Sequence, residues 1–272
     1  MKSTAYLLLS VLFLLSCRSA KQLSGEPFSN KPAWSDEFNS DGMPDSSKWQ
    51  FDIGMGENGW GNNEKQYYVQ DQKNVSIENG FLKITATKEQ QGKAAFHSTK
   101  IHSKGKGDFL YGRMEVRAKV PTQRGTWPAV WMMPSKSVYG GWPKSGEIDI
   151  MEHVGFDPNV MHTTMHMQAF NGMKGNHKTA SKLIPTATSA FHTYRVDWTP
   201  EYINGYIDDE LFFTYQNPHT GSEEWPFDQE FYFIINLAIG GNWGGSKGID
   251  EGSLPAELLV DYIRYYPYLP KK

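Results

Sequence analysis

Apolar and polar residues alternate over several short stretches of this 272-residue chain, and no stretch keeps the spacing of an amphipathic helix. The alternating stretches are residues 81–87, 112–120, 193–198 and 202–208, and Asp208-Asp209 predicts a hairpin turn. Residues 231–238 form a continuous apolar run that suits a strand buried on both sides, and residues 258–266 supply a last strand. The pattern predicts an all-β protein, a two-sheet antiparallel β-sandwich of the jelly-roll kind.

The first 17 residues predict a lipoprotein signal peptide. An apolar run over residues 5–15 is shorter than the roughly 20 residues that a membrane-spanning helix needs. The run ends in Leu14-Leu15-Ser16-Cys17, which resembles a bacterial lipoprotein cleavage box. We expect Cys17 to be lipidated and to become the first mature residue; the alternative is an ordinary signal peptide that contains a cysteine.

Downstream of Cys17 the sequence predicts a tether and one domain. Residues 18–32 are polar and are expected to be flexible. Residues 33–270 show no composition shift, charge run or internal repeat, so we expect one domain, long enough to bury a sizeable core. Cys17 is the only cysteine, so no internal disulfide is expected. We expect a monomer, held by its lipid to the bacterial cell envelope.

Charge and aromatic content narrow the class of partner. The formal net charge is −3, and the lack of a basic excess argues against a nucleic-acid partner. The chain contains nine Trp and fourteen Tyr, more than a core needs, so we expect some aromatic side chains to be exposed for binding.

Three acidic residues, Glu147, Asp149 and Glu152, lie close together in a strand-like segment. Because side chains alternate between the two faces of a strand, Glu147 and Asp149 share one face, and strict alternation turns Glu152 to the apolar face. A buried glutamate there is costly. One β-bulge near Ile150-Met151 would insert an extra residue and return Glu152 to the acidic face. The segment therefore predicts a bulge and three carboxylates on one surface.

Three close carboxylates suit glycoside hydrolysis. Like charges raise the pKa of at least one carboxyl group, which then holds a proton near neutral pH. Hydrolysis with retention needs a nucleophilic carboxylate and a protonated acid about 5–5.5 Å apart. The same residues also fit a solvated acidic face or a Ca²⁺ site, and spacing alone leaves both of these possibilities open.

The segment Glu147-Ile-Asp-Ile-Met-Glu152 closely resembles the catalytic signature of glycoside hydrolase family 16 in its bulge-containing form. Further matching motifs occur in order at residues 59–68, 111–117, 125–134, 152–155, 191–198, 236–245 and 260–264, so the resemblance spans residues 34–267. The combination looks most like laminarinases, which are endo-acting β-1,3-glucanases. The resemblance implies Glu147 as nucleophile, Glu152 as acid/base and Asp149 as helper, with an open substrate cleft on the concave face of the jelly roll.

The resemblance also implies substrate contacts outside the acidic segment. Trp127 and Trp131 are four residues apart on a predicted strand, so both face one side, where they can stack on sugars; the alternative is a place in the core. Trp142 is expected on a loop at the cleft edge, and His166 near the scissile sugar. The full set of candidate contacts is Asn62, Arg113, Trp127, Trp131, Trp142, His166 and Trp243.

The resemblance also implies a possible structural Ca²⁺ on the convex side, held partly by backbone oxygens, as in many members of this family. The matching positions are Glu37, Gly80 and Asp261, and the alternative for Asp261 is a salt bridge or a hydrogen bond. No cofactor is expected for catalysis, and no His/Cys cluster indicates zinc.

The sequence and the resemblance predict retaining endo-hydrolysis of β-1,3-glucan, and of mixed β-1,3/1,4-glucan, through a covalent glycosyl-enzyme intermediate. A close rival function keeps this chemistry and changes the polymer to agar, porphyran or carrageenan. A non-catalytic β-glucan-binding protein and a transglycosylase are compatible with the same fold.

Overall fold

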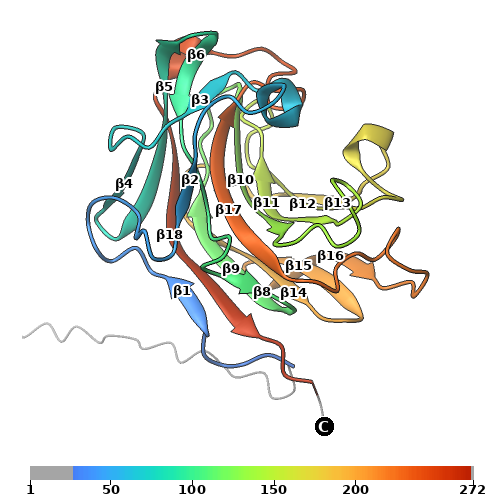
Figure 1. Cartoon of the computed structure of the whole chain (residues 1–272). Helices are drawn as coiled ribbons and strands as arrows, with labels where there is room; N and C mark the ends of the chain where they lie inside the picture. Colours follow the sequence, from blue (N-terminus) through green and yellow to red (C-terminus); the bar gives the residue numbers. More distant parts are fainter. Residues whose placement is uncertain (1–26, 271–272) are drawn as a thin grey trace, which may run out of the picture.

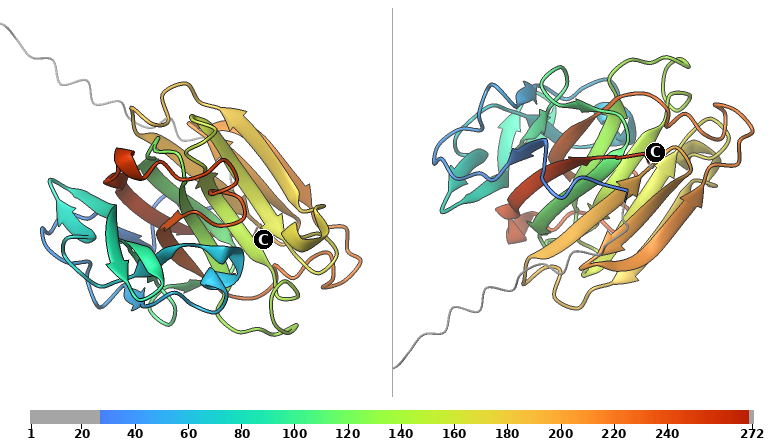
Figure 2. Two further views of the ribbon diagram at one scale, coloured as in Figure 1. Left: turned by 90° about the horizontal axis from the view of Figure 1, so that it is seen from above. Right: turned by 90° about the horizontal axis from the view of Figure 1, so that it is seen from below.

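The computed structural model describes residues 27–270, which fold into two β-sheets that pack face to face (Figures 1 and 2). Neighbouring strands run antiparallel, apart from β3 and β6. The predicted all-β sandwich is confirmed. Within the described residues, no helix is long and apolar enough to cross a membrane.

One sheet has ten strands. Their order is β16 (Glu210–Gln216), β15 (Tyr202–Ile207), β14 (His192–Trp198), β9 (Gly112–Lys119), β18 (Ala256–Pro267), β5 (Phe81–Gln91), β6 (Ala94–Ser98) and β3 (Gln66–Tyr68), with β1 (Trp34–Asp36) beside β18 and β4 (Val75–Glu78) beside β5. All the stretches that alternate in the sequence lie in this sheet, because one of its faces is buried and the other is exposed. The predicted hairpin turn is confirmed at Asp208 and Asp209, which have positive φ angles of 49° and 68°.

The other sheet has eight strands. Their order is β13 (Lys178–Leu183), β12 (Val160–His166), β11 (Glu147–His153), β10 (Thr126–Pro134), β17 (Phe231–Ile239), β7 (Lys100–His102) and β2 (Gln50–Asp52), with β8 (Asp108–Phe109) beside β17. Three short helical turns lie between strands, namely η1 (Gly59–Asn63), η2 (Gly172–Lys174) and η3 (Glu251–Ser253). The continuous apolar run of residues 231–238 is the interior strand β17, as predicted.

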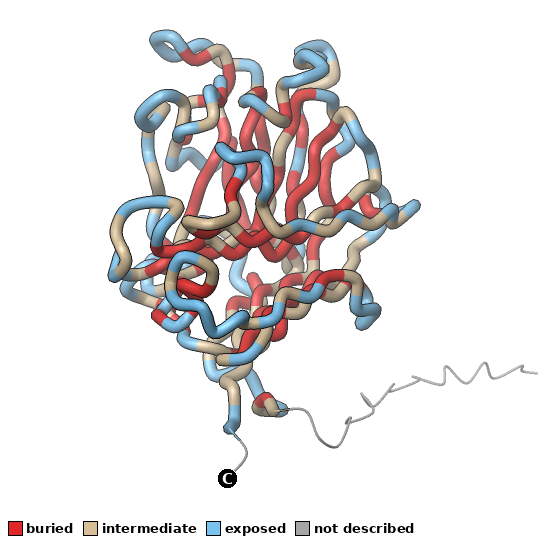
Figure 3. The backbone as a smooth tube through the Cα atoms, turned by 90° about the vertical axis from the view of Figure 1, so that its right-hand side faces the viewer, coloured by how far each residue is buried: buried red, intermediate tan, exposed pale blue. Residues whose placement is uncertain are grey.

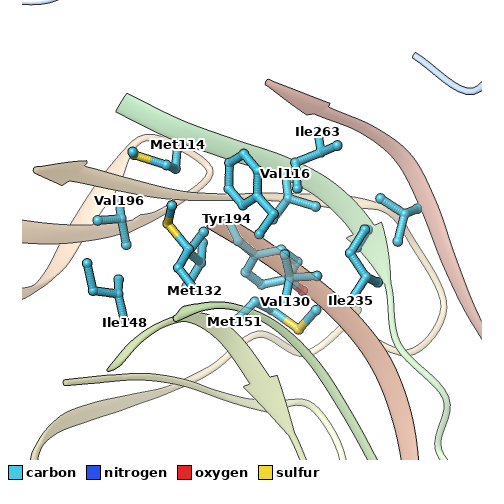
Figure 4. Close-up of a cluster of buried hydrophobic side chains, with 14 of the residues drawn as sticks. Met114, Val116, Val130, Met132, Ile148, Met151, Tyr194, Val196, Ile235 and Ile263 are labelled. Carbon is cyan, nitrogen blue, oxygen red and sulfur yellow. The ribbon is translucent and has the colours of Figure 1, made fainter. Parts of the chain in front are cut away.

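The core lies between the two sheets, where the strands are buried and the connecting loops are exposed (Figure 3). Side chains from β9, β14 and β18 meet side chains from β10, β11 and β17 (Figure 4). Those that Figure 4 labels are Met114, Val116, Val130, Met132, Ile148, Met151, Tyr194, Val196, Ile235 and Ile263. Burial of these apolar side chains supplies the main driving force for folding.

We use the name site face for the face of the eight-stranded sheet that points away from this core. It carries Trp127 and Trp131 of β10 and the three acidic residues of β11, while Val130 and Met132 point into the core. The loop that contains η1 and the loop that contains η2 flank the sheet (Figure 1).

The N-terminal segment packs on the domain from residue 27 onward. The Phe28 side chain is only 8% exposed, and its ring centroid lies 6.1 Å from that of Tyr268. Backbone hydrogen bonds join Ser29 to Pro267 and Leu269 to Pro27. The predicted flexible tether over residues 18–32 is therefore wrong for its last six residues, because an apolar side chain anchors them. Residues 18–26, Cys17 and the predicted signal peptide lie outside the described residues.

Candidate active site

The carboxylates of β11 reach the same face through a β-bulge. Across the pairing with β10, Val130 is opposite Met151 and Trp131 is opposite Asp149, which leaves Ile150 as the extra residue. The pairing with β12 shifts register at the same place, between Asp149 and Glu152. Met151 is fully buried, and Glu152 returns to the site face. The predicted bulge at Ile150-Met151 is confirmed.

Burial raises the pKa values of all three carboxyl groups above their usual range. Burial raises the pKa of Glu147 to about 7, although hydrogen bonds from Trp142 and Asp149 oppose the shift. Burial, followed by the negative charge of Glu147, raises the pKa of Glu152 to about 7. Burial and the two glutamates raise the pKa of Asp149 well above its usual range. The triad therefore carries fewer than three negative charges at neutral pH.

Hydrogen bonding divides the protons among the three groups. Asp149 keeps its proton and donates a hydrogen bond to Glu147. The indole Nε1 of Trp142 also donates to Glu147 Oε2, at 2.7 Å. Glu152 accepts a longer hydrogen bond of 3.1 Å from Trp127 Nε1 and a second one from Thr164, and burial, together with the negative charge of Glu147, raises its pKa. This arrangement favours an ionised Glu147 and a protonated Glu152, as a nucleophile and a general acid require.

His166 faces the acidic pair as a neutral hydrogen-bond donor. Its Nδ1 accepts the backbone N–H of Gly172 at 3.1 Å, so Nε2 carries the ring proton. Nε2 lies 3.4 Å from Asp149 Oδ2 and 3.8 Å from Glu147 Oε1. Burial lowers the pKa of His166 to about 4, so the ring stays neutral.

The same three side chains offer ligand atoms within 4.8 Å of one another, which is close enough for one metal ion. A metal at His166 Nε2 would need the other tautomer, and the hydrogen bond from Gly172 would then be lost. The donor set therefore fits proton and hydrogen-bond chemistry, and it does not fit a metal centre.

Aromatic side chains surround the carboxylates on the site face. Trp127 and Trp131 lie on the same face of β10 and are partly exposed, as the spacing predicts. The ring centroid of Trp243 lies 5.4 Å from that of Trp127. Trp142 is 42% exposed and lies on the loop before β11. These rings offer flat apolar faces beside the acids, of the kind that stack on sugar rings.

Asn62 lies at the border of the site face. Its backbone carbonyl oxygen accepts a hydrogen bond from the backbone N–H of Asn242 at 2.8 Å. This bond joins the η1 loop to the loop that carries Trp243. The side-chain amide of Asn62 points to Glu64, with a distance of 3.4 Å between Nδ2 and Oε1.

Arg113 does not belong to the site. It lies on β9 of the ten-stranded sheet, and its neighbour Met114 points into the core, so the Arg113 side chain lies on the opposite outer surface of the sandwich. Its guanidinium donates two hydrogen bonds to Asp197, at 2.7 and 2.9 Å. The prediction that Arg113 contacts substrate is wrong, because the motif that contains it belongs to the other sheet.

The expected calcium ligands face arginine side chains. Arg264 donates to both carboxylate oxygens of Glu37, at 2.9 and 2.6 Å, and Arg117 forms an ion pair with Asp261. Gly80 lies in the turn between β4 and β5, with a φ of 79°. A guanidinium already balances each negative charge, so these side chains fit two ion pairs and do not fit a calcium site built on both carboxylates.

Sequence reasoning missed a set of buried polar groups beneath Trp131. Glu64, Tyr68 and Asn236 are all buried and joined by hydrogen bonds. A signal for them was present, since Asn236 interrupts the apolar run of residues 231–238 and Glu64 lies within the motif of residues 59–68.

Comparison with known proteins agrees with this geometry. A model of the glycosyl hydrolases family 16 matches residues 62–263. A β-glucanase of Rhodothermus marinus is 43% identical over 270 residues, which is 94% of each chain. The structure of the laminarinase from Rhodothermus marinus has a TM-score of 0.85 at 43% identity, covering 89% of this chain and 98% of that one. The laminarinase from Flavobacterium sp. UMI-01 has a TM-score of 0.80 at 41% identity, covering 87% and 100%. The chain belongs to glycosyl hydrolase family 16.

Proposed function

We propose that this protein is a retaining endo-β-1,3-glucanase that also cleaves mixed β-1,3/1,4-glucan. The observation that carries the proposal is the bulged strand, on which Glu147 and Glu152 lie on one face among tryptophan rings, each with a pKa raised to about 7. Relatives support the choice of polymer. They include a glucan endo-1,3-β-glucosidase of Cryptopygus antarcticus, 36% identical over 252 residues, and a non-specific endo-β-1,3(4)-glucanase whose structure has a TM-score of 0.84.

In the proposed reaction, each proton and bond of a two-step displacement is accounted for. A carboxylate oxygen of Glu147 attacks the anomeric carbon while the bond to the leaving oxygen breaks and Glu152 gives that oxygen its proton. The product of this step is a glycosyl ester of Glu147. Glu152, now ionised, takes a proton from a water molecule that attacks the same carbon, and Glu147 leaves as a carboxylate. Asp149 keeps its hydrogen bond to Glu147, which steadies the charge that returns to this carboxylate.

Substitution of the two glutamates tests these roles. Glu147→Gln should abolish release of reducing sugar from laminarin, and Glu152→Gln should lower kcat by about 10²–10⁴-fold, the usual contribution of a general acid–base group. Glu78→Gln, at an exposed turn between β4 and β5, serves as the control. Proton NMR of the first products should show the β-anomer. Full activity of the Glu147→Gln protein, or initial release of the α-anomer, would refute the assignment.

A second polymer class has one observation in its favour. A keratan-sulfate endo-1,4-β-galactosidase of Sphingobacterium multivorum is 39% identical over 237 residues. Laminarin, lichenan, keratan sulfate, agar and carrageenan should therefore be compared in one assay. Greater kcat/KM on a galactan than on laminarin would keep the chemistry and overturn the proposed substrate.

A binding protein without activity is distinguished in the same experiment. A β-1,3-glucan-binding protein of Penaeus monodon is 36% identical over 173 residues. This chain retains all three carboxyl groups of the catalytic segment, with raised pKa values on the site face. Laminarin binding without any release of oligosaccharides would favour a binding protein over the enzyme, and products longer than the substrate would reveal transglycosylation.

We further propose that Cys17 carries a lipid that holds the enzyme at the bacterial cell envelope. The support is the sequence around Cys17, where an apolar run ends in a small residue followed by cysteine. Labelled palmitate should be incorporated into the wild-type protein and not into Cys17→Ala. Labelling that persists in Cys17→Ala would refute the anchor.

A further inference from the structure

A chain of hydrogen bonds runs from Trp131 to a buried carboxylate. Trp131 lies on the site face directly opposite Asp149 in the pairing of β10 with β11. Its indole Nε1 donates to Asn236 Oδ1 at 2.7 Å, and Asn236 Nδ2 donates to the hydroxyl oxygen of Tyr68 at 3.0 Å. The Tyr68 hydroxyl donates in turn to Glu64 Oε2 at 3.3 Å. Trp131 is thus connected to Glu64 through two intervening side chains.

A second branch reaches the same carboxylate oxygen from the backbone. The N–H of Ile239 donates to Gln66 Oε1 at 2.8 Å, so the amide nitrogen of Gln66 faces the other way and donates to Glu64 Oε2 at 2.6 Å. Glu64, Gln66 and Tyr68 are each less than a tenth exposed, so water does not replace these bonds readily.

The direction of both branches depends on one acceptor. An indole N–H and a backbone N–H can only donate, so each branch begins with a donor and must end on an acceptor. Glu64 Oε2 supplies that acceptor for both. Burial raises the pKa of Glu64, and the hydrogen bonds from Gln66 and Asn62 oppose that shift. Without this acceptor oxygen, the Tyr68 hydroxyl has no acceptor in the chain, and the amide of Asn236 is free to turn its nitrogen toward Trp131. Two donors would then face each other, and the indole ring would be pushed from its position.

We propose that Glu64 is a positioning residue of the active site, which orients Trp131 beside the catalytic carboxylates through Tyr68 and Asn236. The side chain of Glu64 forms its hydrogen bonds with Asn62, Gln66 and Tyr68 and not with the catalytic carboxylates. The positioning role rests on the proposed function, because Trp131 serves there as a sugar platform. A buried carboxylate that directly follows η1 is thereby linked to the orientation of a ring on the site face.

The test uses three single variants and one double variant of the full-length protein, together with two independent measurements. Glu64→Met removes the acceptor and keeps the side-chain length, and Tyr68→Phe removes one hydroxyl from the middle of the chain. Both should lower kcat/KM on laminarin by about tenfold or more, since small displacements of positioning groups have effects of this size. Glu64→Gln keeps an oxygen for Tyr68 and Gln66 and should stay within about threefold of the wild type. The kcat/KM of the double variant Glu64→Met/Tyr68→Phe should be no lower than that of the less active single variant, because both substitutions act through one chain of hydrogen bonds.

A readout that does not depend on activity separates this proposal from the proposed function. In ¹⁵N–¹H spectra of the tryptophan indoles, the Trp131 signal is identified by its absence in Trp131→Phe. That signal should shift in Glu64→Met and in Tyr68→Phe, and it should stay in place in Glu78→Met, which alters an exposed carboxylate that is paired with Lys83.

An unshifted Trp131 signal in Glu64→Met, or losses that multiply in the double variant, overturns the positioning role. If Glu64→Met does not fold, the test rests on Tyr68→Phe, which removes only one oxygen atom. An unshifted Trp131 signal in Tyr68→Phe would then overturn the positioning role. A wild-type protein that cleaves none of the tested polysaccharides would overturn the proposed function and leave the indole result standing.

Discussion

Replacing Trp142 by Phe should shift the acidic limb of the pH–rate profile upward. The change removes the 2.7 Å hydrogen bond from Nε1 to Glu147 Oε2 and keeps an aromatic ring. A hydrogen bond to a charged group is worth about 1.5–3 kcal/mol. Because Trp142 is 42% exposed, water replaces part of the lost hydrogen bond, so we expect the loss to cost about 1 kcal/mol. Since 1.36 kcal/mol corresponds to one pKa unit, the pKa of Glu147 should rise by about 0.7 units.

The direction of the pKa shift depends on which form of Glu147 the indole stabilises. The N–H donates to the ionised nucleophile, so its loss favours protonated Glu147, and activity is lost at a higher pH than in the wild type. The assay is kcat/KM on laminarin from acid to neutral pH for the wild type, Trp142→Phe and Trp142→Ala. Well below the pKa, kcat/KM of Trp142→Phe should be about fivefold lower than that of the wild type, as 0.7 units imply, and the acidic limb of Trp142→Ala should shift by the same amount. Any rise of KM from lost sugar stacking should appear in Trp142→Ala alone. An acidic limb that stays in place in Trp142→Phe would refute the reasoning.

Two further predictions follow from the strand and from the ion pairs. Deletion of Ile150 should leave measurable hydrolysis, because removal of the bulge residue keeps Glu147 and Glu152 on one face. Deletion of Ile148, an equally buried isoleucine, should abolish hydrolysis, because it turns Glu147 and Asp149 to opposite faces of the strand. Equal activity of the two deletion proteins would contradict the bulge. Excess EDTA should leave the thermal midpoint unchanged, because both candidate carboxylates are paired with arginines. A calcium ion present at a thousand times its Kd would add about 4 kcal/mol to the free energy of unfolding, so a clear drop in the midpoint would reveal one.

Local pattern was sufficient for the strands and for the catalytic segment. Side chains alternate between the two faces of a strand, so the face of each residue can be predicted from its position. The sequence therefore predicted that Glu147 and Asp149 share a face and that Glu152 needs a bulge to join them. Four-residue spacing placed Trp127 and Trp131 together for the same reason. The resemblance to family 16 then supplied the assignment of roles, which the hydrogen bonds from Asp149 and Trp142 to Glu147 support.

The wrong predictions have a common physical origin. Alternation does not say to which sheet a strand belongs, so Arg113 was assigned to the substrate although β9 lies in the other sheet. Composition marked residues 27–32 as a tether, yet Phe28 finds a buried place beside Tyr268, more than two hundred residues away.

The class of fold, the three carboxylates and the bulge could be predicted from the sequence, because each of these follows from side-chain alternation within a single strand. The chemistry of their surroundings could not, because it depends on how the strands come together. The arginines on Glu37 and Asp261 and the link from Glu64 to Trp131 join residues from different strands or loops that are far apart in the sequence. Such contacts depend on strand order and on long-range pairing, which local periodicity does not encode.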